Sequence, residues 1–536
     1  MNKSFFKRWA FLSLAGAMSL GVLLGSVGCS GKKPAPEATG TEPRQSNSTA
    51  GGEEETASGL PSWNDMNSPT ALKYKPTEKN YDRDFTMLTE VSEFYYTTYV
   101  YDYETKGEPT EICDMAIWQR QAFLEEQFGI TLKRVDKVGS ESTSAFTQAM
   151  ASGDKICDVT CFRGTNSMTM AAEGYLLDAN RIRALNLDAP YWDQRIREEY
   201  RVGDYLFTLD GEFNFIDDLR TYVVIYNDTM YSANDFYTKY GSPYELSEAG
   251  KWTFAQMMEM IKDCGSLNTD QKEDGTWAMV TEKQAPYCFL LGAGVQMVKN
   301  DKGNLSINFK DNWQSVSDMI DAYMALGKDQ NVIFADRPGD FADTTDIWST
   351  ASNIFMYNRA MFRSTTLSAV LRLLDMEDDY GIMPVPNYAE TPSGEEAVYH
   401  CWVEPQTHHP LSFPVTSASD IQTIGEMTEI LAYYSLYGAD SLNRAFYDLL
   451  AYARLCRRPE DTKMLRLVFA NKTYDIDHAA GITGVYKVLV DVVAEKAYGT
   501  LASELNAIKT SSETKMQQWV ADLMLNVAKK HPDLNN

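Results

Sequence analysis

The chain has 536 residues, of which 44% are hydrophobic and 12% aromatic, and it carries a formal net charge of −26. A chain of this length can bury a large core and form two or three domains. Because phosphates would repel so acidic a protein, the composition argues against nucleic acid as a partner and favours a neutral or cationic ligand.

The first 28 residues have the pattern of a secretory signal peptide. Basic residues come first. The apolar run over residues 10–24 that follows is shorter, and richer in small residues, than a typical membrane-spanning helix. Residues 25–29 read Gly-Ser-Val-Gly-Cys and resemble a bacterial lipobox, although Ser26 stands where leucine is usual. We therefore predict cleavage before Cys29 and lipidation of its thiol. An ordinary signal peptide with a chance cysteine and an uncleaved anchor are the alternatives.

Residues 29–80 are predicted to form a lipidated flexible linker. Most of this stretch is rich in Pro, Gly, Ser, Thr and Glu and has no periodic apolar residues, so it cannot bury enough surface to offset the entropy of the chain. A linker of about 50 residues has an r.m.s. reach of roughly 40 Å. Such a reach would hold a folded body, beginning near Asp82, away from a membrane surface.

Beyond the linker, strand-like and helix-like segments alternate. A helix is predicted over residues 112–128, because its apolar side chains fall on one face and Gly129 follows it. A second helix is predicted from Thr253 to Cys264, because Thr253 and Gln256 match a capping box. Strands are expected at residues 85–91, 130–135, 158–162 and 222–226, and the region after residue 421 is expected to be mostly helical. This alternation predicts an α/β fold with parallel sheets covered by helices.

Motifs of known chemistry are largely missing from the sequence. It contains no serine-hydrolase elbow, no zinc-protease helix and no phosphate-binding loop. The segment from Asp270 to Gly275 is similar to a calcium loop, but Lys272 occupies the third ligand position, so calcium is not expected there. His408 and His409 are expected to be a solvated loop pair rather than metal ligands. We therefore predict no cofactor and no metal.

Seven cysteines follow Cys29, and their spacing matches no metal motif. An odd number cannot all pair within one chain, so we expect mainly buried free thiols. They are Cys113, Cys157, Cys161, Cys264, Cys288, Cys401 and Cys456.

Five segments, in order, resemble the extracellular solute-binding proteins, family 1, of bacterial ABC sugar importers. They span residues 106–132, 173–194, 202–231, 250–264 and 378–388. The second contains Tyr-Trp-Asp where Trp-Trp-Asp is frequent in the family, and the fourth carries the frequent Lys-Trp-Thr helix start. The fifth is similar to the family's Gly-Ile-x-Pro-x-Pro strand, with Asn387 where lysine is more common.

The resemblance implies a two-lobed periplasmic-binding-protein-like (type II) fold with a hinge and an interlobe cleft. The chain would cross between the lobes near residues 209–222, 345–354 and 401–413. Lobe 1 would then comprise residues 81–210 plus 350–410, and lobe 2 would comprise residues 211–349 plus 411–536.

The implied function is capture of a carbohydrate, most simply an oligosaccharide, and its delivery to the permease subunits of an ABC transporter. The protein would be a monomer, held by its lipid anchor at the extracellular face of the cell membrane, and would not be an enzyme.

A sugar site needs aromatic faces for the apolar faces of sugar rings and charged or amide groups for the hydroxyls. Residues that follow strands or lie near the expected crossings are the candidates. They are Tyr95, Tyr96, Phe162, Arg163, Phe215, Asp217, Arg363, Ser364, Trp402 and Glu404. Each has a structural alternative: the tyrosines as core, Phe215 and Trp402 as hinge packing, and the arginines as partners in surface salt bridges.

Two other functions share the anchor, the acidity and the aromatic content. A tethered surface enzyme that degrades polysaccharide would need catalytic carboxylates, and Asp217 with Asp218 is one candidate pair. A glycan-binding adhesin would have a static site rather than a hinged cleft.

Overall fold

The computed structural model describes residues 68–76, 79–91, 109–265, 267–270, 274–341 and 346–531. The signal peptide, Cys29 and most of the linker lie outside these ranges, as do the candidate site residues Tyr95 and Tyr96. Within the described ranges, every helix is either too short or too polar to cross a membrane.

A four-stranded sheet with the strand order β12-β3-β1-β2 forms the first part of the fold. Strand β1 (Arg83–Val91) pairs in parallel with β2 (Ile130–Val138) and β3 (Val159–Cys161), and β12 (Leu411–Ser412) lies antiparallel to β3. Helix α2 (Ile112–Phe128) precedes β2 and ends as predicted at Gly129, whose φ of 60° lies in the left-handed region.

A five-stranded mixed sheet with the order β10-β4-β9-β5-β8 forms the second part. Strands β5 (Trp277–Thr281), β8 (Val332–Phe334) and β9 (Ala360–Thr366) run in parallel, while β4 (Tyr222–Asn227) is antiparallel to both β9 and β10 (Tyr380–Met383). Every residue of β4 and of β9 is buried, so the centre of this sheet is covered on both faces.

Helices cover the second sheet on both faces. Helix α10 (Phe254–Asp263) begins at Thr253 as predicted, because the Thr253 hydroxyl accepts the backbone N–H of Gln256 at 3.3 Å. Helix α13 (Ile347–Met356) packs against β5 and β9. The other elements up to residue 420 are α1 (Pro69–Tyr74), α3 (Gly139–Ser152), α4 (Gly164–Ala172), η2 (Ala179–Arg181), α5 (Gln194–Glu199), α6 (Ile216–Leu219), α7 (Asp228–Ala233), α8 (Phe236–Tyr240), α9 (Pro243–Glu248), α11 (Ala285–Gly292), β6 (Val298–Asp301), β7 (Asn304–Ile307), α12 (Trp313–Lys328), α14 (Leu367–Val370), η3 (Leu371–Leu373), β11 (Cys401–Trp402) and η4 (Val415–Asp420).

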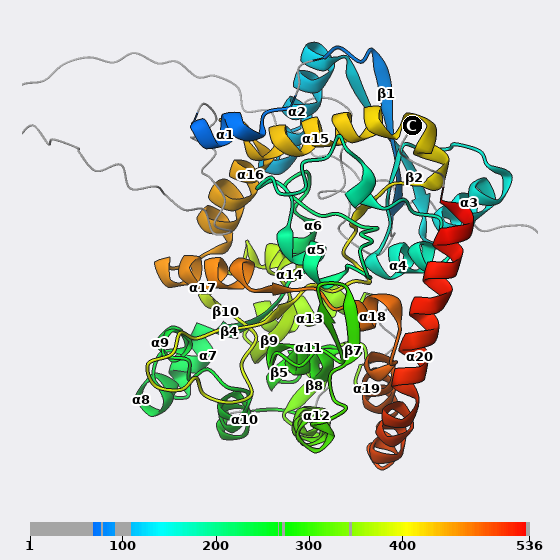
Figure 1. Cartoon of the computed structure of the whole chain (residues 1–536). Coiled ribbons are helices and arrows are strands. Elements are labelled where there is room, and N and C mark those ends of the chain that lie inside the picture. Colours follow the sequence, from blue (N-terminus) through cyan, green and yellow to red (C-terminus); the bar gives the residue numbers. More distant parts are fainter. Residues whose placement is uncertain are drawn as a thin grey trace, which may run out of the picture. The chain divides into compact units, whose positions relative to one another are not determined.

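The predicted helical region after residue 421 is confirmed. Helix α15 (Ile421–Leu436) and the π-helical segment η5 (Ala445–Leu455) pack against α2 in the first part. The last helix, α20 (Leu501–Lys530), contacts both α4 of the first part and α19 (Val485–Glu495) of the second, as its red ribbon shows in Figure 1. The remaining elements are α16 (Leu442–Arg444), α17 (Pro459–Ala470), β13 (Lys472–Thr473) and α18 (Ile476–Ala480).

Among the described residues, two passages of the chain join the two sheets, and a third joins η5, packed on the first part, to β13. The chain leaves β3 of the first sheet and enters β4 of the second through residues 162–221, and it returns between β10 and β12 through residues 384–410. These two passages overlap the crossings expected at 209–222 and 401–413. This third passage lies between η5 and β13, at residues 456–471, and not at the expected 345–354, of which residues 347–354 belong to α13 between β8 and β9.

These pairings differ from the expected division of the chain. Strands β9 and β10 lie within residues 350–410, which were expected in lobe 1, but both belong to the second sheet. Conversely, α15 and η5 were expected in lobe 2 and pack on the first part. The physical reason is that the sheet to which a strand such as β9 belongs depends on its long-range pairing, which its own sequence does not specify.

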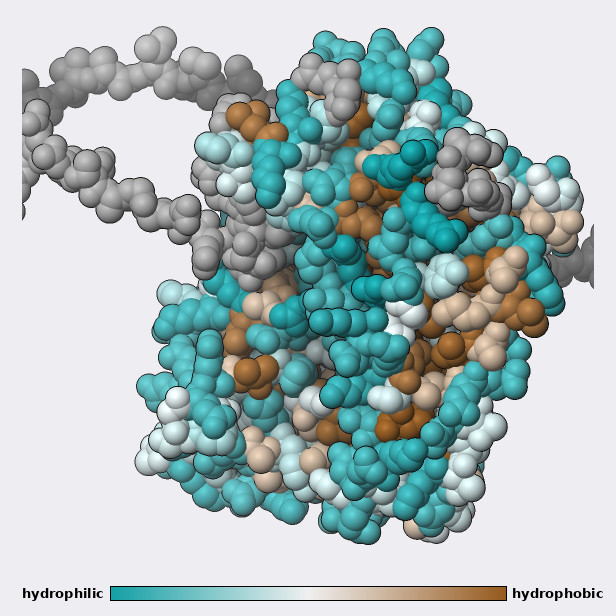
Figure 2. All heavy atoms as spheres, in the orientation of Figure 1, coloured by the Kyte–Doolittle hydropathy of each residue, from teal (hydrophilic) through white to brown (hydrophobic). Residues whose placement is uncertain are grey.

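The surface drawn in Figure 2 is mostly hydrophilic, with scattered hydrophobic patches. The thiols agree with expectation: all seven cysteines after Cys29 lie in the described ranges and are free, six of them buried and Cys456 partly exposed.

Candidate functional site

A cavity of about 330 Å³ lies where strands of the second sheet end. Lys283 and Gln284 follow β5, Asp336 follows β8 and Thr366 ends β9, and all four line it. The carboxyl ends of parallel strands are the usual place for a ligand site in open α/β sheets. The other lining residues are Arg220, Tyr222, Ile347, Trp348, Ser368, Ala369, Arg372, Glu404, Gln406, Thr407, Tyr486 and Val490.

A second cavity, of about 590 Å³, adjoins the first and has walls from both parts of the fold. The start of α2 and the end of η5 contribute from the first part, and α13 with η3 contributes from the second. Arg220, Ser368 and Arg372 line both cavities. The two cavities therefore form one cleft between the two parts of the fold, with these three residues at its middle.

Three arginines are held near the middle of the cleft by serine hydroxyls. The guanidinium of Arg220 donates to the Ser368 hydroxyl at 3.0 Å, and that of Arg372 donates to the Ser349 hydroxyl at 2.7 Å. Arg363 lies fully buried on β9 and donates to Ser352 at 2.9 Å. Ser349 and Ser352 themselves line the larger cavity, so all three guanidiniums lie at or directly behind its wall.

The buried carboxylate of Glu282 lies beside Arg363, with the closest oxygen 3.5 Å from a guanidinium nitrogen. Burial raises the pKa of Glu282 to about 7, although Arg363 acts in the opposite direction. Neither oxygen of Glu282 has a hydrogen-bond partner among the described residues, nor has Nε or Nη2 of Arg363. This pair is therefore a loosely bonded charged group close behind the cleft.

Segments from the first two passages, and the strand that follows the third, run side by side next to the cleft. Strand β11, from the second passage, pairs in parallel with β13, which follows the third. Val403 forms a bridge with Thr221, and Leu209 exchanges backbone hydrogen bonds with Leu411. We call residues 209–221, 401–411 and 471–474 the crossing segments. Their contact makes this region the connection between the two parts of the fold.

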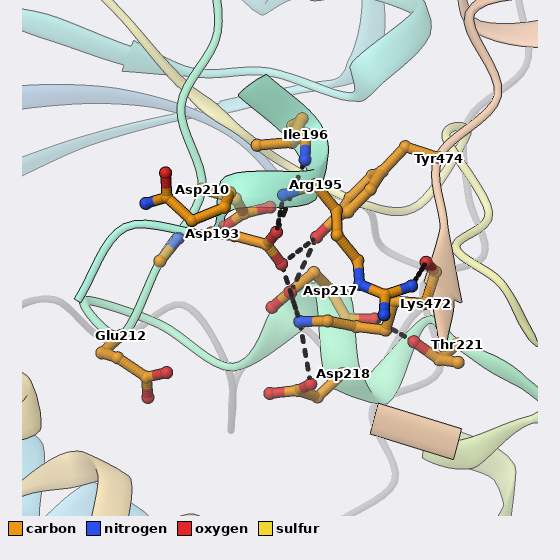
Figure 3. A network of polar contacts seen from close by, with 12 residues as sticks. Asp193, Arg195, Ile196, Asp210, Glu212, Asp217, Asp218, Thr221, Lys472 and Tyr474 are labelled. Atoms are coloured by element: carbon orange, nitrogen blue, oxygen red, sulfur yellow. Dashed lines mark hydrogen bonds and ion pairs between the residues drawn. The ribbon is translucent and has the colours of Figure 1, made fainter. Parts of the chain in front are cut away.

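A buried ion cluster ties two of the crossing segments together (Figure 3). The ammonium of Lys472 on β13 contacts the carboxylates of Asp193 at 3.0 Å and Asp218 at 3.1 Å, and also that of Asp217. The Tyr474 hydroxyl donates to Asp193 and to Asp217 at 2.9 and 3.0 Å. Asp217 and Asp218 lie on α6 in the first crossing segment, so one lysine joins that segment to β13.

The charges of this cluster shift the pKa of its members in opposite directions. Burial alone would lower the pKa of Lys472, but the three carboxylates outweigh burial and raise it. Burial, followed by the charge of Asp217, raises the pKa of Asp218 to about 7. For Asp193, the ammonium of Lys472 outweighs the effect of burial and lowers the pKa.

The structure places some of the candidate residues named from the sequence in the cavity walls and others away from them. Glu404 lines the smaller cavity and Phe215 lines the larger one. The ring of Phe215 stacks on that of Phe446, with the ring centroids 4.6 Å apart. Arg163, whose side chain is 30% exposed, pairs with Glu90 at 3.0 Å. Phe162 is buried against Phe146 in a hydrophobic cluster and faces neither cavity.

Four further candidates are buried behind the cleft. Asp217 belongs to the ion cluster, and Arg363 and Ser364 lie on the covered strand β9. Trp402 corrects an expectation, because its ring is fully buried and stacks on Tyr222 with the ring centroids 5.0 Å apart. The ring that was expected to be available for a sugar is therefore covered by protein, and Tyr222 lines the cavity instead.

His408 and His409 also differ from expectation. Both are buried rather than solvated, and His408 bonds to Asp210, joining two crossing segments. Across the described ranges, no group of three or more His, Cys, Asp or Glu side chains is placed to hold a metal ion.

Sequence reasoning missed most of the cleft wall. Arg220, Gln284, Trp348, Ser368 and Arg372 were not candidates, although all line the smaller cavity. Arg220 comes shortly before the predicted strand at residues 222–226, and this position near a strand end could have marked it as a candidate site residue. Strand β5, which precedes Gln284, was not predicted from the sequence. Residues that follow its carboxyl end were therefore not considered as site candidates.

No family model matches the chain, and no curated protein matches it. Several solved structures, in contrast, are similar to the chain. A cyclo/maltodextrin-binding protein complexed with maltotetraose superimposes with a TM-score of 0.50 and 11% identity, covering 85% of this chain and 98% of that protein. An ABC substrate-binding protein from Listeria monocytogenes in complex with cycloalternan gives a TM-score of 0.53 and 10% identity, covering 81% of this chain and 99% of that protein. The chain thus has the two-lobed α/β fold of periplasmic binding proteins, with its cleft between the lobes.

Proposed function

We propose that this chain is an extracellular solute-binding protein that captures an oligosaccharide and delivers it to an ABC permease. The observation that carries the proposal is the cleft, which lies at the carboxyl ends of strands and between the two parts of the fold. Two proteins of the same fold hold a maltotetraose and a cycloalternan.

The chemistry of the cleft wall suits a saccharide. Trp348 and Tyr486 are partly exposed aromatic side chains in the smaller cavity, and flat faces of this kind pack against the apolar faces of sugar rings. Gln284, Asp336 and Glu404 supply amide and carboxylate groups that can bond sugar hydroxyls.

Capture would proceed by closure of the two parts on the ligand. Contacts that the ligand makes only in the closed arrangement would shift the population toward it. The three crossing segments, joined by backbone bonds and by Lys472, would bend as one hinge. A monomer with such a hinge could present its closed form to permease subunits, and lipidation at Cys29 would keep it at the extracellular face of the membrane.

Binding without turnover is part of the proposal. The solved structures of the same fold are binding proteins. Asp217 and Asp218, the carboxylate pair considered for glycoside hydrolysis, contact Lys472 in the hinge and line neither cavity. Incubation of catalytic amounts of protein with oligosaccharides should leave them intact, and sustained hydrolysis would favour the tethered enzyme.

Titration calorimetry on the Trp348→Ala variant tests the site. We expect its affinity for a bound oligosaccharide to fall on the order of tenfold or more, because aromatic anchors dominate binding energies. Trp313→Ala serves as the matched control, since Trp313 is also partly exposed but lies on α12 outside both cavities. Equal affinities for the two variants would exclude this cavity as the sugar site.

A further inference from the structure

The two cavities of the cleft have apolar walls of different chemistry. Aromatic side chains line the smaller cavity, whereas most apolar side chains of the larger one are aliphatic. Five of these aliphatic side chains are partly exposed, and they come from both parts of the fold. They are Ile112, Met356, Leu371, Leu374 and Leu450. All five pack against the same hydrophobic core, so together they form one apolar wall, which we call the aliphatic wall.

The larger cavity becomes more apolar with depth. Glu111 and Arg454 line it and pair with each other at 3.6 Å, and their side chains are 54% and 42% exposed, so they lie at its mouth. Leu219 and Phe215 line it too but are only 1% and 4% exposed. An apolar interior with polar groups at the rim is the usual arrangement of a surface that buries an apolar partner.

Two serine hydroxyls in the same cavity are already bonded to the protein. The hydroxyl of Ser349 donates to Asp346 at 2.5 Å and accepts from Arg372 at 2.7 Å. The hydroxyl of Ser352 accepts from Arg363 at 2.9 Å. Because a hydroxyl has a single O–H to donate, that of Ser349 is used. A sugar placed here would lose hydrogen bonds to water without regaining all of them, which costs free energy.

The smaller cavity has more hydrogen-bonding capacity for a sugar. The amide of Gln284 donates to the hydroxyl of Tyr222 at 2.9 Å, and an amide can form further bonds through its second N–H and its carbonyl oxygen. Asp336 and Glu404 add carboxylate oxygens, and Trp348 adds an aromatic ring. A sugar unit is therefore better accommodated in the smaller cavity, and a group without hydroxyls in the larger one.

We propose that the cleft selects an oligosaccharide that carries an uncharged apolar chain, and that the larger cavity binds this chain while the smaller cavity binds the sugar. This inference rests on the proposed function and narrows it to a class of ligand. Arg220, Ser368 and Arg372 line both cavities. An apolar chain attached to a sugar in the smaller cavity can therefore extend directly into the larger one.

The aliphatic wall is placed to stabilise closure around such a ligand. Ile112 and Leu450 belong to elements of the first part, and Met356 and Leu371 belong to elements of the second. An apolar chain between them would contact both parts at once. Burial of its methylene groups would favour the closed arrangement, in addition to the contacts of the sugar.

Titration calorimetry with the full chain tests the class of ligand. The probes are maltotriose, cellotriose and xylotriose, each compared with its own hexyl glycoside. We expect at least one hexyl glycoside to bind about tenfold or more tightly than its parent sugar, because its methylene groups leave water. The heat-capacity change on binding should also be more negative for the hexyl glycoside, since more apolar surface is buried.

Met356→Gln tests the aliphatic wall, because Met356 is only partly buried at the end of α13 and glutamine has a similar length. This variant should reduce the advantage of the hexyl glycoside about fivefold or more, while the affinity for the parent sugar changes little. Met319→Gln is the matched control and should change neither. Met319 is also partly buried and packs against a hydrophobic core, but it lies on α12 outside both cavities.

The outcomes separate this inference from the proposed function. Equal affinities for each parent sugar and its hexyl glycoside, or an advantage that Met356→Gln leaves unchanged, overturn the inference and leave the proposed function standing. An equal loss of affinity for both ligands also overturns it, because the aliphatic wall would then be a contact between the two parts on closure. Absence of binding to any probe, with an intact thermal melt, argues against the proposed function itself. If Met356→Gln does not fold, Leu374→Ala provides the same comparison.

Discussion

Trp402 and Glu404 are two residues apart in the sequence, and the structure gives them different roles. Glu404 lines the smaller cavity, whereas Trp402 lies fully buried behind Tyr222 and packs against Tyr287 with the ring centroids 5.6 Å apart. Residues two apart in a continuous strand would share a face, so the different orientations follow from the chain leaving strand β11 after Trp402. Proximity to a crossing is therefore a weak guide to ligand contact.

Trp402→Ala should reduce stability more than affinity. Removing a fully buried indole leaves a cavity and costs about 3–5 kcal/mol of unfolding free energy. We expect the melting temperature to fall by several degrees, with ligand affinity of the folded variant close to that of the wild type. Thermal melts and calorimetry on the same sample separate the two effects. A large loss of affinity with an unchanged melt would place the ring in the site after all.

Glu282→Gln should change how stability depends on pH. The pKa of Glu282 is about 7 in the folded protein and is raised by burial, so the folded state keeps a proton that the unfolded state has lost. The free energy of unfolding of the wild type should therefore fall as pH rises from about 4.5 to 7. The variant should lack the contribution of Glu282 to this loss of stability.

Melting temperatures of the two proteins at pH 5 and pH 7.5 measure this difference. The variant's melting temperature relative to wild type should be higher at pH 7.5 than at pH 5. A difference that is constant across this range would contradict the assigned pKa.

At the scale of elements, the proposed hinge is held by charge as well as by backbone pairing. Strands β11 and β13 are only two residues long each. The ion cluster of Lys472 adds a link from α6 to β13 that such short strands cannot supply by themselves. Because the cluster joins segments from different passages, it restricts their relative movement more than a bond within one segment would.

Lys472→Gln should strongly destabilise the protein at neutral pH. Removing the ammonium leaves three buried carboxylates without their cation, and breaking a buried pair typically costs about 3–5 kcal/mol. Lys472 lowers the pKa of Asp193, so the stability it provides is present above the unfolded pKa and is lost as pH falls. The gap between wild-type and variant melting temperatures should therefore narrow at low pH.

Lys463→Gln is the control, since Lys463 is 65% exposed and pairs with Glu248 on the surface at 3.2 Å. Exposed pairs of this kind contribute about 0–1 kcal/mol. Equal destabilisation by the two variants would mean that the cluster does not support the hinge.

At the scale of the whole molecule, the folded body is expected to act at a membrane that it does not enter by any described helix. Cys29 and residues 30–67 of the predicted linker precede the described ranges, and the proposed tether rests on the sequence pattern around Cys29. The prediction of a flexible linker up to residue 80 is wrong at its end, because residues 69–74 form α1 and Ala71 is buried in the core. A tether of this kind would keep the cleft close to a permease while leaving the two parts free to close.

Cys29→Ala should release the protein into the medium or leave it unprocessed, because the lipid can no longer be attached. Membrane and medium fractions of a bacterial culture, probed with an antibody against the body, measure the outcome. Wild-type protein should stay with the membrane fraction. A processed variant that remains membrane-bound to the same extent would rule out the lipid anchor.

The sequence by itself determined the local elements. The stop of α2 at Gly129, the start of α10 at Thr253 and the buried strand at residues 222–226 all depend on neighbours within a few residues, and all are present in the structure. The ordered motifs also pointed to the two-lobed fold. These features are readable because propensity, capping and apolar spacing act over short distances.

Only the tertiary structure decided which strands share a sheet and which side chains meet. Strand β9 joins the second sheet by pairing with β4, more than a hundred residues earlier in the chain, and nothing in its own seven residues specifies that partner. Arg220 and Arg372 line the same cavity, and Lys472 contacts Asp217, because of such long-range packing. Contacts between distant segments depend on how whole elements pack, and no spacing along the chain records that packing.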